Sequence, residues 1–291
     1  MYASEFDYYR PTSVDEAIDL LDEHDGAELL AGGHGILPLL KIGEVTVPVL
    51  VDIGNIEGLD GIEEDGNTLT IGALTPHATV AKSDAVGQHA TALADATAEL
   101  GDLQVRNGGT IGGNLAHGDP RADPPASLLA LGGSLLARGP EGERTIDADA
   151  LFRGEFDTDV GDNEVVTAVE LPVDEAAVSA YTRHRNPLSG YAMVGVAARI
   201  HTDADTVTDV RVAATGATEH TVRLHGVEDA LDGVILDEEA IGNAAEDAAE
   251  DFDPDDLQSD VQASGEYRAH LLGIYTERTL TRVLERIDAG E

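Results

Sequence analysis

The chain has 291 residues, of which 57 are acidic and 17 basic, so its formal net charge is −40. A charge of this sign argues against nucleic acid and anionic membranes as partners, because both are themselves negative. Cysteine is absent, which excludes disulfides, a thiolate nucleophile and an iron–sulfur cluster bound by this chain.

The first 55 residues predict a β-α-β-like unit. Residues 6–11 read as a short strand, and Ser13 followed by Glu16 forms a capping box that opens an amphipathic helix. Residues 28–30 and 47–53 predict two further strands.

A glycine segment, Ala31-Gly32-Gly33-His34-Gly35, follows the apolar pair Leu29-Leu30 and precedes a second helical pattern. A strand, a glycine turn and a helix start is an arrangement that binds phosphate through unpaired backbone N–H groups. The pattern is GGxG rather than GxGxxG, and GxxxxGK[ST] is absent, so neither a Rossmann fingerprint nor a P-loop is present.

A hairpin is predicted over 58–73 with its turn at 65–67, followed by a helix that starts at Thr75-Pro76-His77 and a helix over 85–100. The stretch 104–125 then carries five glycines in its first part and two adjacent prolines at its end. We interpret it as an ordered loop that holds a ligand, since helical turns tolerate glycine poorly. An ordinary glycine-rich surface turn is the alternative.

The remaining pattern predicts short elements and then a long C-terminal helix. Val173-Asp174-Glu175 marks a domain boundary, which gives domains at 1–174, with subdomains of about 1–55 and 56–174, and at 175–291. The most acidic tract, 246–256, reads as a solvated face. Helices are predicted over 126–131, 226–232, 237–251 and 267–287, and strands over 133–138, 165–171, 179–185, 191–201 and 207–215.

Missing patterns exclude other classes of site. There is no HExxH motif and no histidine pair flanked by carboxylates, so we expect no bound metal. There is no apolar run of membrane-spanning length and no signal-peptide pattern, so we expect no membrane insertion and a cytoplasmic location. The excess of carboxylates, with Lys41 and Lys82 as the only lysines, favours a halophilic cytoplasm.

Together, Ala31-Gly32-Gly33-His34-Gly35 and Thr110-Ile111-Gly112-Gly113-Asn114 resemble the two FAD-binding signatures of the flavin subunit of molybdenum hydroxylases. That family includes the medium chains of carbon monoxide dehydrogenases and the flavin domain of xanthine dehydrogenase. The resemblance runs from about residue 6 to the C-terminus. It implies an α+β fold, in which a two-subdomain FAD-binding domain of the vanillyl-alcohol-oxidase/PCMH type precedes a smaller α+β C-terminal domain.

The resemblance also implies a set of FAD-binding residues and no catalytic acid, base or nucleophile. Asp123 matches the family's acidic residue beside the flavin, although it could equally cap a helix that starts at Pro124. Tyr191 falls where the family places a residue beside the flavin ring, although a buried strand tyrosine is an equal alternative, and Gly190 replaces the family's frequent aspartate. The full set is Leu30, Ala31, Gly32, Gly33, His34, Gly35, Thr110, Ile111, Gly112, Gly113, Asn114, Asp123 and Tyr191.

The implied function is electron transfer within a complex. A molybdopterin-binding large subunit oxidises the substrate, a two-iron–two-sulfur small subunit relays electrons, and this chain passes them through FAD to an external acceptor. The absence of cysteine agrees with clusters that are housed in a partner. Two alternatives stay open: a stand-alone FAD-dependent oxidase and a non-catalytic FAD- or nucleotide-binding module.

Overall fold

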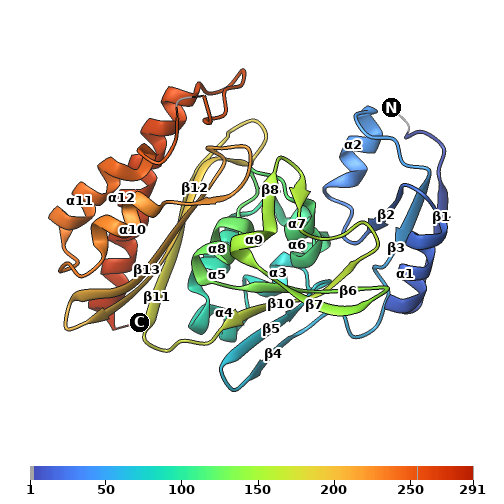
Figure 1. Cartoon of the computed structure of the whole chain (residues 1–291), viewed down its shortest axis with the longest axis horizontal. Helices are drawn as coiled ribbons and strands as arrows, with labels where there is room; N and C mark the ends of the chain where they lie inside the picture. Colours follow the sequence, from blue (N-terminus) through green and yellow to red (C-terminus); the bar gives the residue numbers. More distant parts are fainter. Residues whose placement is uncertain (1–2, 254, 291) are drawn as a thin grey trace.

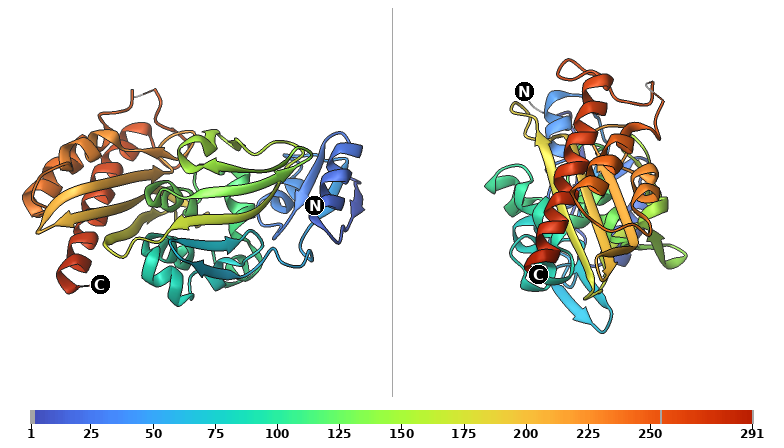
Figure 2. Two further views of the ribbon diagram at one scale, coloured as in Figure 1. Left: turned by 60° about the horizontal axis from the view of Figure 1, so that its bottom comes forward. Right: turned by 90° about the vertical axis from the view of Figure 1, so that its left-hand side faces the viewer.

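The computed structural model describes residues 3–253 and 255–290. The molecule is elongated, with an N-terminal unit at one end, a central unit in the middle and a C-terminal unit at the other end (Figures 1 and 2). Helices cover sheets that are antiparallel outside the N-terminal unit, so the architecture is α+β as expected. Among the described helices, none is both long and apolar enough to cross a lipid bilayer.

The N-terminal unit is a parallel sheet of order β1-β3-β2 with α1 packed on it. The side chain of Ser13 accepts a hydrogen bond from the amide of Glu16, which fixes where α1 begins. The strands and the capped helix predicted for this unit are confirmed. Its elements are β1 (Asp7–Tyr9), α1 (Val14–Glu23), β2 (Ala27–Leu30), α2 (Ile36–Ile42) and β3 (Val49–Asp52).

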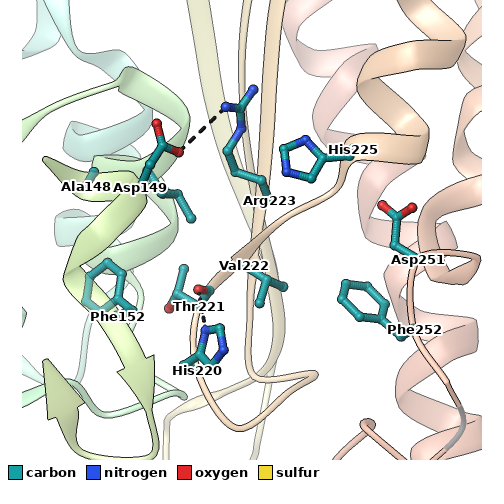
Figure 3. A pocket seen from close by; sticks show the side chains of 11 residues that line it. Ala148, Asp149, Phe152, His220, Thr221, Val222, Arg223, His225, Asp251 and Phe252 are labelled. Carbon is teal, nitrogen blue, oxygen red and sulfur yellow. Dashed lines mark hydrogen bonds and ion pairs between the residues drawn. The ribbon is translucent and has the colours of Figure 1, made fainter.

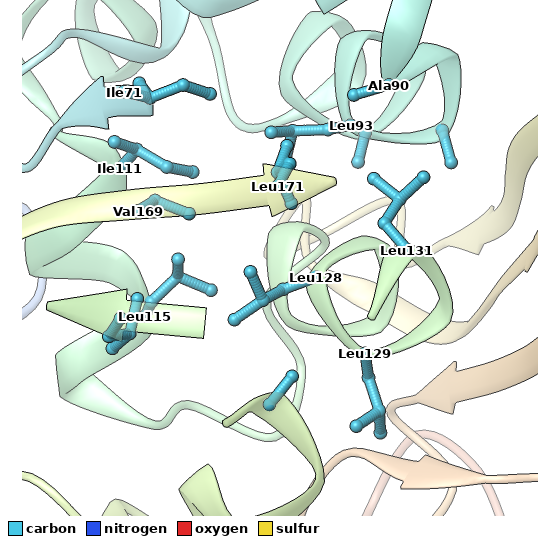
Figure 4. Close-up of a cluster of buried hydrophobic side chains, with 14 of the residues drawn as sticks. Ile71, Ala90, Leu93, Ile111, Leu115, Leu128, Leu129, Leu131, Val169 and Leu171 are labelled. Atoms are coloured by element: carbon cyan, nitrogen blue, oxygen red, sulfur yellow. The ribbon is translucent and has the colours of Figure 1, made fainter. Parts of the chain in front are cut away.

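The central unit is built on an antiparallel sheet of order β4-β5-β10-β6-β7. Leucine and isoleucine side chains from the sheet and its helices form the core that Figure 4 shows. The hairpin predicted over 58–73 is confirmed by β4 and β5. The strands are β4 (Ile62–Asp65), β5 (Thr68–Gly72), β6 (Ser134–Gly139), β7 (Gly142–Asp147), β8 (Phe152–Gly154), β9 (Asp157–Thr158) and β10 (Val165–Pro172). The helices are α3 (His77–Val80), α4 (Asp84–His89), α5 (Thr91–Glu99), α6 (Leu103–Gly108), α7 (Ile111–His117), α8 (Pro124–Leu131) and α9 (Ala148–Leu151).

The stretch 104–115 is mostly helical, so the prediction of a loop there is wrong. It forms most of α6 and α7, which are capped by the side chains of Asp102 and Thr110. Helix propensity is a weak preference that tertiary packing overrides. Ile111 and Leu115 are fully buried in the central core, and their packing outweighs the cost of the glycines.

The single helix predicted over 85–100 is also wrong, because the chain breaks at Ala90 into α4 and α5. Beyond the break, the amide of Ala92 donates to the hydroxyl of Ser179 (3.1 Å). The carbonyl of Ala92 accepts from Ser127 (2.9 Å). These tertiary bonds connect the start of α5 to two neighbouring elements.

The C-terminal unit is an antiparallel sheet of order β11-β12-β13-β14 with helices on both faces. Helix α12 covers one face, and α5 and α8 of the central unit cover the other. Because both faces are buried, β12 reads as an almost continuous apolar run rather than an alternating one. The elements are β11 (Ala177–Arg185), β12 (Ala192–Asp203), β13 (Thr206–Thr215), β14 (Val222–Arg223), α10 (His225–Leu231), α11 (Glu238–Glu246), the 3₁₀ turn η1 (Asp247–Ala249) and α12 (Gly265–Ala289).

Candidate functional site

The first glycine segment, residues 31–35, connects β2 to α2 and contains an unsatisfied row of donors. Gly33 has φ +74°, a left-handed conformation that glycine adopts without strain. Within the part of the chain that the structure describes, the amides of Gly32, Gly33, His34 and Gly35 donate to no protein acceptor. Leu30 ends β2, and Ala31 connects it to Gly32. Successive free amides of this kind form a concave site for an anion.

The second glycine segment, residues 110–114, is the cap and first turn of α7, and the amides of residues 111–114 donate to protein acceptors. Those of Ile111 and Gly112 donate to the carbonyls of Thr75 (3.0 Å) and Ala73 (2.9 Å). The amide of Gly113 donates to the Thr110 hydroxyl oxygen (3.3 Å). This segment therefore differs from the expected row of open amides.

Side chains, rather than amides, are what the second segment offers to a ligand. The Asn114 Oδ1 atom is buried and has no hydrogen-bond partner among the described residues. Buried polar atoms are normally paired, so an orphaned one calls for an explanation, such as a bound group. The Thr110 hydroxyl, which accepts from Gly113, still has its own proton to donate.

The two segments lie against each other. A Cβ added to Gly113 would stand 2.8 Å from the Thr110 hydroxyl oxygen and 3.3 Å from the Cβ of Ala31. A Cβ added to Gly32 would overlap the carbonyl oxygen of Gly108, which ends α6. Residues that are about 80 positions apart in sequence therefore meet through glycine surfaces that leave no room for a side chain.

Histidines surround this contact. His34 reaches Gly108, and the ring of His117 touches Gly35, where an added Cβ would lie 2.8 Å from its Cδ2 atom. Burial lowers the pKa of His117. His77, to which the sequence assigns no role, is buried next to Gly109, and burial lowers its pKa to about 4.

Asp123 is buried in an ion pair that reaches across to β11. Both of its carboxylate oxygens accept from Arg183 Nη1 (2.9 Å), and one also accepts from the Tyr181 hydroxyl (2.5 Å). It occupies the N-cap position of α8, which begins at Pro124 as the capping alternative expects, but its side chain makes no capping bond and accepts from Arg183 and Tyr181 instead. Arg183, which sequence reasoning missed, also donates to the carbonyl of Gly190 (3.1 Å) and so connects Asp123 to the turn before Tyr191.

Tyr191 is 39% exposed, so the alternative of a buried strand tyrosine is wrong. The guanidinium of Arg121 lies over its ring, 5.2 Å from the centroid. Arg121 follows the second glycine segment, and Asp119 accepts two hydrogen bonds from its side chain. The structure thus brings the two glycine segments into direct contact. Asp123 lies in the stretch that follows the second segment, and Tyr191 contacts Arg121 in the same stretch.

A separate cavity of about 510 Å³ lies between the central and C-terminal units. Phe152 and Phe252 line it from opposite sides, with His220 between them, as Figure 3 shows. The arginine in its lining, Arg223, is paired with Glu228 (2.7 Å) and Asp149 (3.6 Å). It contains none of the residues predicted from the sequence.

Comparison with known proteins shows the family to which the chain belongs. Residues 4–174 match the family described as the FAD binding domain in molybdopterin dehydrogenase. Residues 179–283 match the family described as the CO dehydrogenase flavoprotein C-terminal domain. The chain belongs to the FAD-binding subunits of molybdenum hydroxylases.

Individual relatives of this flavoprotein match over nearly their whole length. It is 34% identical to the nicotine 6-hydroxylase medium subunit of Paenarthrobacter nicotinovorans, covering 94% of this chain and 95% of that one. It is also 34% identical to the carbon monoxide dehydrogenase medium chain of Hydrogenophaga pseudoflava, covering 98% and 99% of the two chains. The solved structure of the Hydrogenophaga pseudoflava enzyme superposes with a TM-score of 0.93 over the same shares.

Proposed function

We propose that this flavoprotein is the electron-transfer subunit of a molybdopterin-dependent dehydrogenase. It takes electrons from a two-iron–two-sulfur subunit, which receives them from a molybdopterin-binding subunit, and passes them to an external acceptor. Bound FAD supplies the exchange between single-electron and two-electron chemistry, while the protein supplies binding, orientation and electrostatics. The family membership and the chain's lack of cysteine ligands support this assignment.

The observation that carries the proposal is that, among the described residues, the segment with free backbone amides contacts the segment that holds the unpartnered side-chain oxygen of Asn114. The amides of residues 32–35 would bind the pyrophosphate of FAD, and Thr110 and Asn114 would donate to and accept from the neighbouring part of the cofactor. Leu30, Ala31, Ile111, Gly112 and Gly113 would shape this cradle by packing. Asp123 and Tyr191 would stand toward the flavin end, at the junction with the C-terminal unit.

The acidic composition is compatible with a phosphate ligand. Backbone amides bind an anion at contact distance without lysine or arginine, so the net charge of −40 opposes binding mainly through long-range repulsion. At ~1 M salt the Debye length is ~3 Å, which removes most of that repulsion. We therefore propose that the complex works in a salt-rich cytoplasm.

We also propose the functional division of the chain at 174/175, which lies in the link between β10 and β11. The FAD-binding domain would then be residues 1–174 and the C-terminal domain residues 175–291. This division assigns the glycine segments and Asp123 to one domain, and Arg183 and Tyr191 to the other. FAD would therefore meet both domains.

The test is purification of a tagged chain in molar salt from cells that also express its partner genes. We expect FAD, molybdenum and iron to co-purify with it, as measured by released flavin and by metal analysis. Flavin without molybdenum or iron, reduced directly by a small alcohol, would instead support the stand-alone oxidase. A chain that carries nucleotide but never flavin would support the non-catalytic module.

A further inference from the structure

One bulky residue near the glycine segments has a strained backbone. Phe156, between β8 and β9, has φ +56°. The other non-glycine residues with positive φ among those described are Ala204 and Asp205, which form the tight turn of the β12–β13 hairpin, where such angles are expected. A left-handed aromatic residue is uncommon, and such strain persists only where the surroundings impose it.

Hydrogen bonds to the end of α7 impose this conformation. The Phe156 amide donates to the carbonyl of Gly118 (3.1 Å), and the Thr158 hydroxyl donates to the carbonyl of Ala116 (3.2 Å). Both acceptors follow the second glycine segment in the chain. The β8–β9 hairpin is therefore docked on the C-terminal end of the helix that the second segment begins.

Burial of the ring does not offset the backbone strain, because Phe156 is 41% exposed. Instead the ring packs on His117, with the two ring centroids 5.0 Å apart. The His117 ring in turn touches Gly35, in the first glycine segment. Phe156, His117 and Gly35 thus form a continuous contact from the hairpin, through the end of α7, to the loop with the free amides.

We propose that Phe156 is a positioning residue for FAD, which holds the His117 ring against Gly35 and so fixes the spacing between the two glycine segments. This inference rests on the proposed function, because the spacing matters only if one ligand contacts both segments. The alternative is that the hairpin needs only its backbone shape, in which case the ring has no effect on ligand binding.

Replacement by glycine separates these two roles, because Phe156→Gly removes the ring and relieves the left-handed strain at once. We expect the melting temperature to stay the same or rise. The dissociation constant for FAD should rise roughly three- to tenfold, which is the effect of losing one aromatic contact. Phe156→Tyr keeps the ring and should bind FAD as the wild type does. The measurement is FAD titration by flavin fluorescence, with melting curves of the same samples in molar salt.

Ala204→Gly is the matched control, since it relieves a left-handed residue in the β12–β13 turn without touching the glycine segments. It should raise the melting temperature and leave FAD affinity unchanged. Unchanged FAD affinity in Phe156→Gly, or equal weakening in Phe156→Gly and Phe156→Tyr, would overturn the inference.

A second readout does not depend on FAD. Burial lowers the pKa of His117, which also lies near the charges of Asp119 and Arg121. If Phe156 covers this ring, Phe156→Gly should raise the His117 pKa, measured by NMR titration of labelled histidine. An unchanged pKa would also overturn the inference, whereas a wild-type chain and complex that fail to bind FAD would overturn the proposed function.

Discussion

At the scale of single residues, the buried pair of Asp123 and Arg183 connects the central and C-terminal units. Burial raises the pKa of Asp123 to about 6, although the charge of Arg183 and the hydrogen bond from Tyr181 act to lower it. Because the folded pKa lies above the ordinary value of 3.8, this carboxyl contributes stability at low pH. That contribution is complete below about pH 4 and is lost as the pH rises through about 6.

Arg183→Met should therefore destabilise the protein in a pH-dependent way. Loss of the guanidinium raises the Asp123 pKa further and leaves its charge unpaired at high pH, which costs about 3–5 kcal/mol. At pH 5 the carboxyl takes up a proton and the deficit relative to the wild type should shrink. Urea unfolding at pH 5 and pH 8 measures both deficits; equal values would contradict this account. In an Asp123→Asn background the pH dependence of the deficit should disappear.

At the scale of elements, α7 explains why the glycine-rich stretch folds as a helix. Gly112 lies in its first turn, where an added Cβ would stand 2.5 Å from the Cβ of Ala73 and 2.8 Å from its Cα. The glycine that weakens the helix in isolation is what lets the helix approach β5 and bury Ile111. The prediction from sequence took account of the low helix propensity of glycine, but the close approach of α7 to β5 is a tertiary contact with no local signal.

Gly112→Ala should consequently lower the free energy of unfolding by about 1–3 kcal/mol through overpacking. Gly87→Ala is the matched control, because Gly87 lies in α4 with no atom near its added Cβ. That substitution should raise the free energy of unfolding by about 0.5–1 kcal/mol. Denaturant unfolding of both variants in molar salt checks the pair. A Gly112→Ala variant as stable as Gly87→Ala would show that the contact with Ala73 is not tight.

Elements with a strong local pattern could be predicted, and those defined by tertiary contacts could not. The amphipathic C-terminal helix and the hairpin over 58–73 follow from periodicity and turn residues, and both are confirmed. The β8–β9 hairpin has strands too short to show a period, and hydrogen bonds to α7 hold it in place. The resemblance assigned both glycine segments to one cofactor, but their direct contact had no local signal. The pairing of Arg183 with Asp123 had no local signal.

At the scale of the whole molecule, the net negative charge determines how stability depends on salt. The net charge of −40 opposes the compact state through self-repulsion, which salt screens. Many of the arginines are engaged in specific pairs, as in the contact of Arg282 and Arg286 on α12 with Asp95 on α5.

We expect the melting temperature to rise when KCl is increased from about 0.2 M to about 2 M, because the Debye length falls to about 3 Å or less. The deficit of Arg183→Met should change little with salt, since Asp123 and Arg183 are buried from the screening ions. Melting curves at both salt concentrations check this. A melting temperature independent of salt would contradict the role given to surface charge.

The central claim is that one FAD contacts both glycine segments, and FAD titration of the wild type and Gly113→Val in molar salt tests it most directly. A side chain at Gly113 would press on the Thr110 hydroxyl and on Ala31, at the contact of the two segments. The account predicts that the wild type, alone or with co-expressed partners, keeps flavin through gel filtration. It predicts that Gly113→Val melts at a lower temperature because of overpacking. At a temperature where the variant is still folded, it should bind FAD about ten- to a hundredfold more weakly, because Thr110 and Ala31 are displaced from the ligand. Full flavin content in Gly113→Val would contradict it.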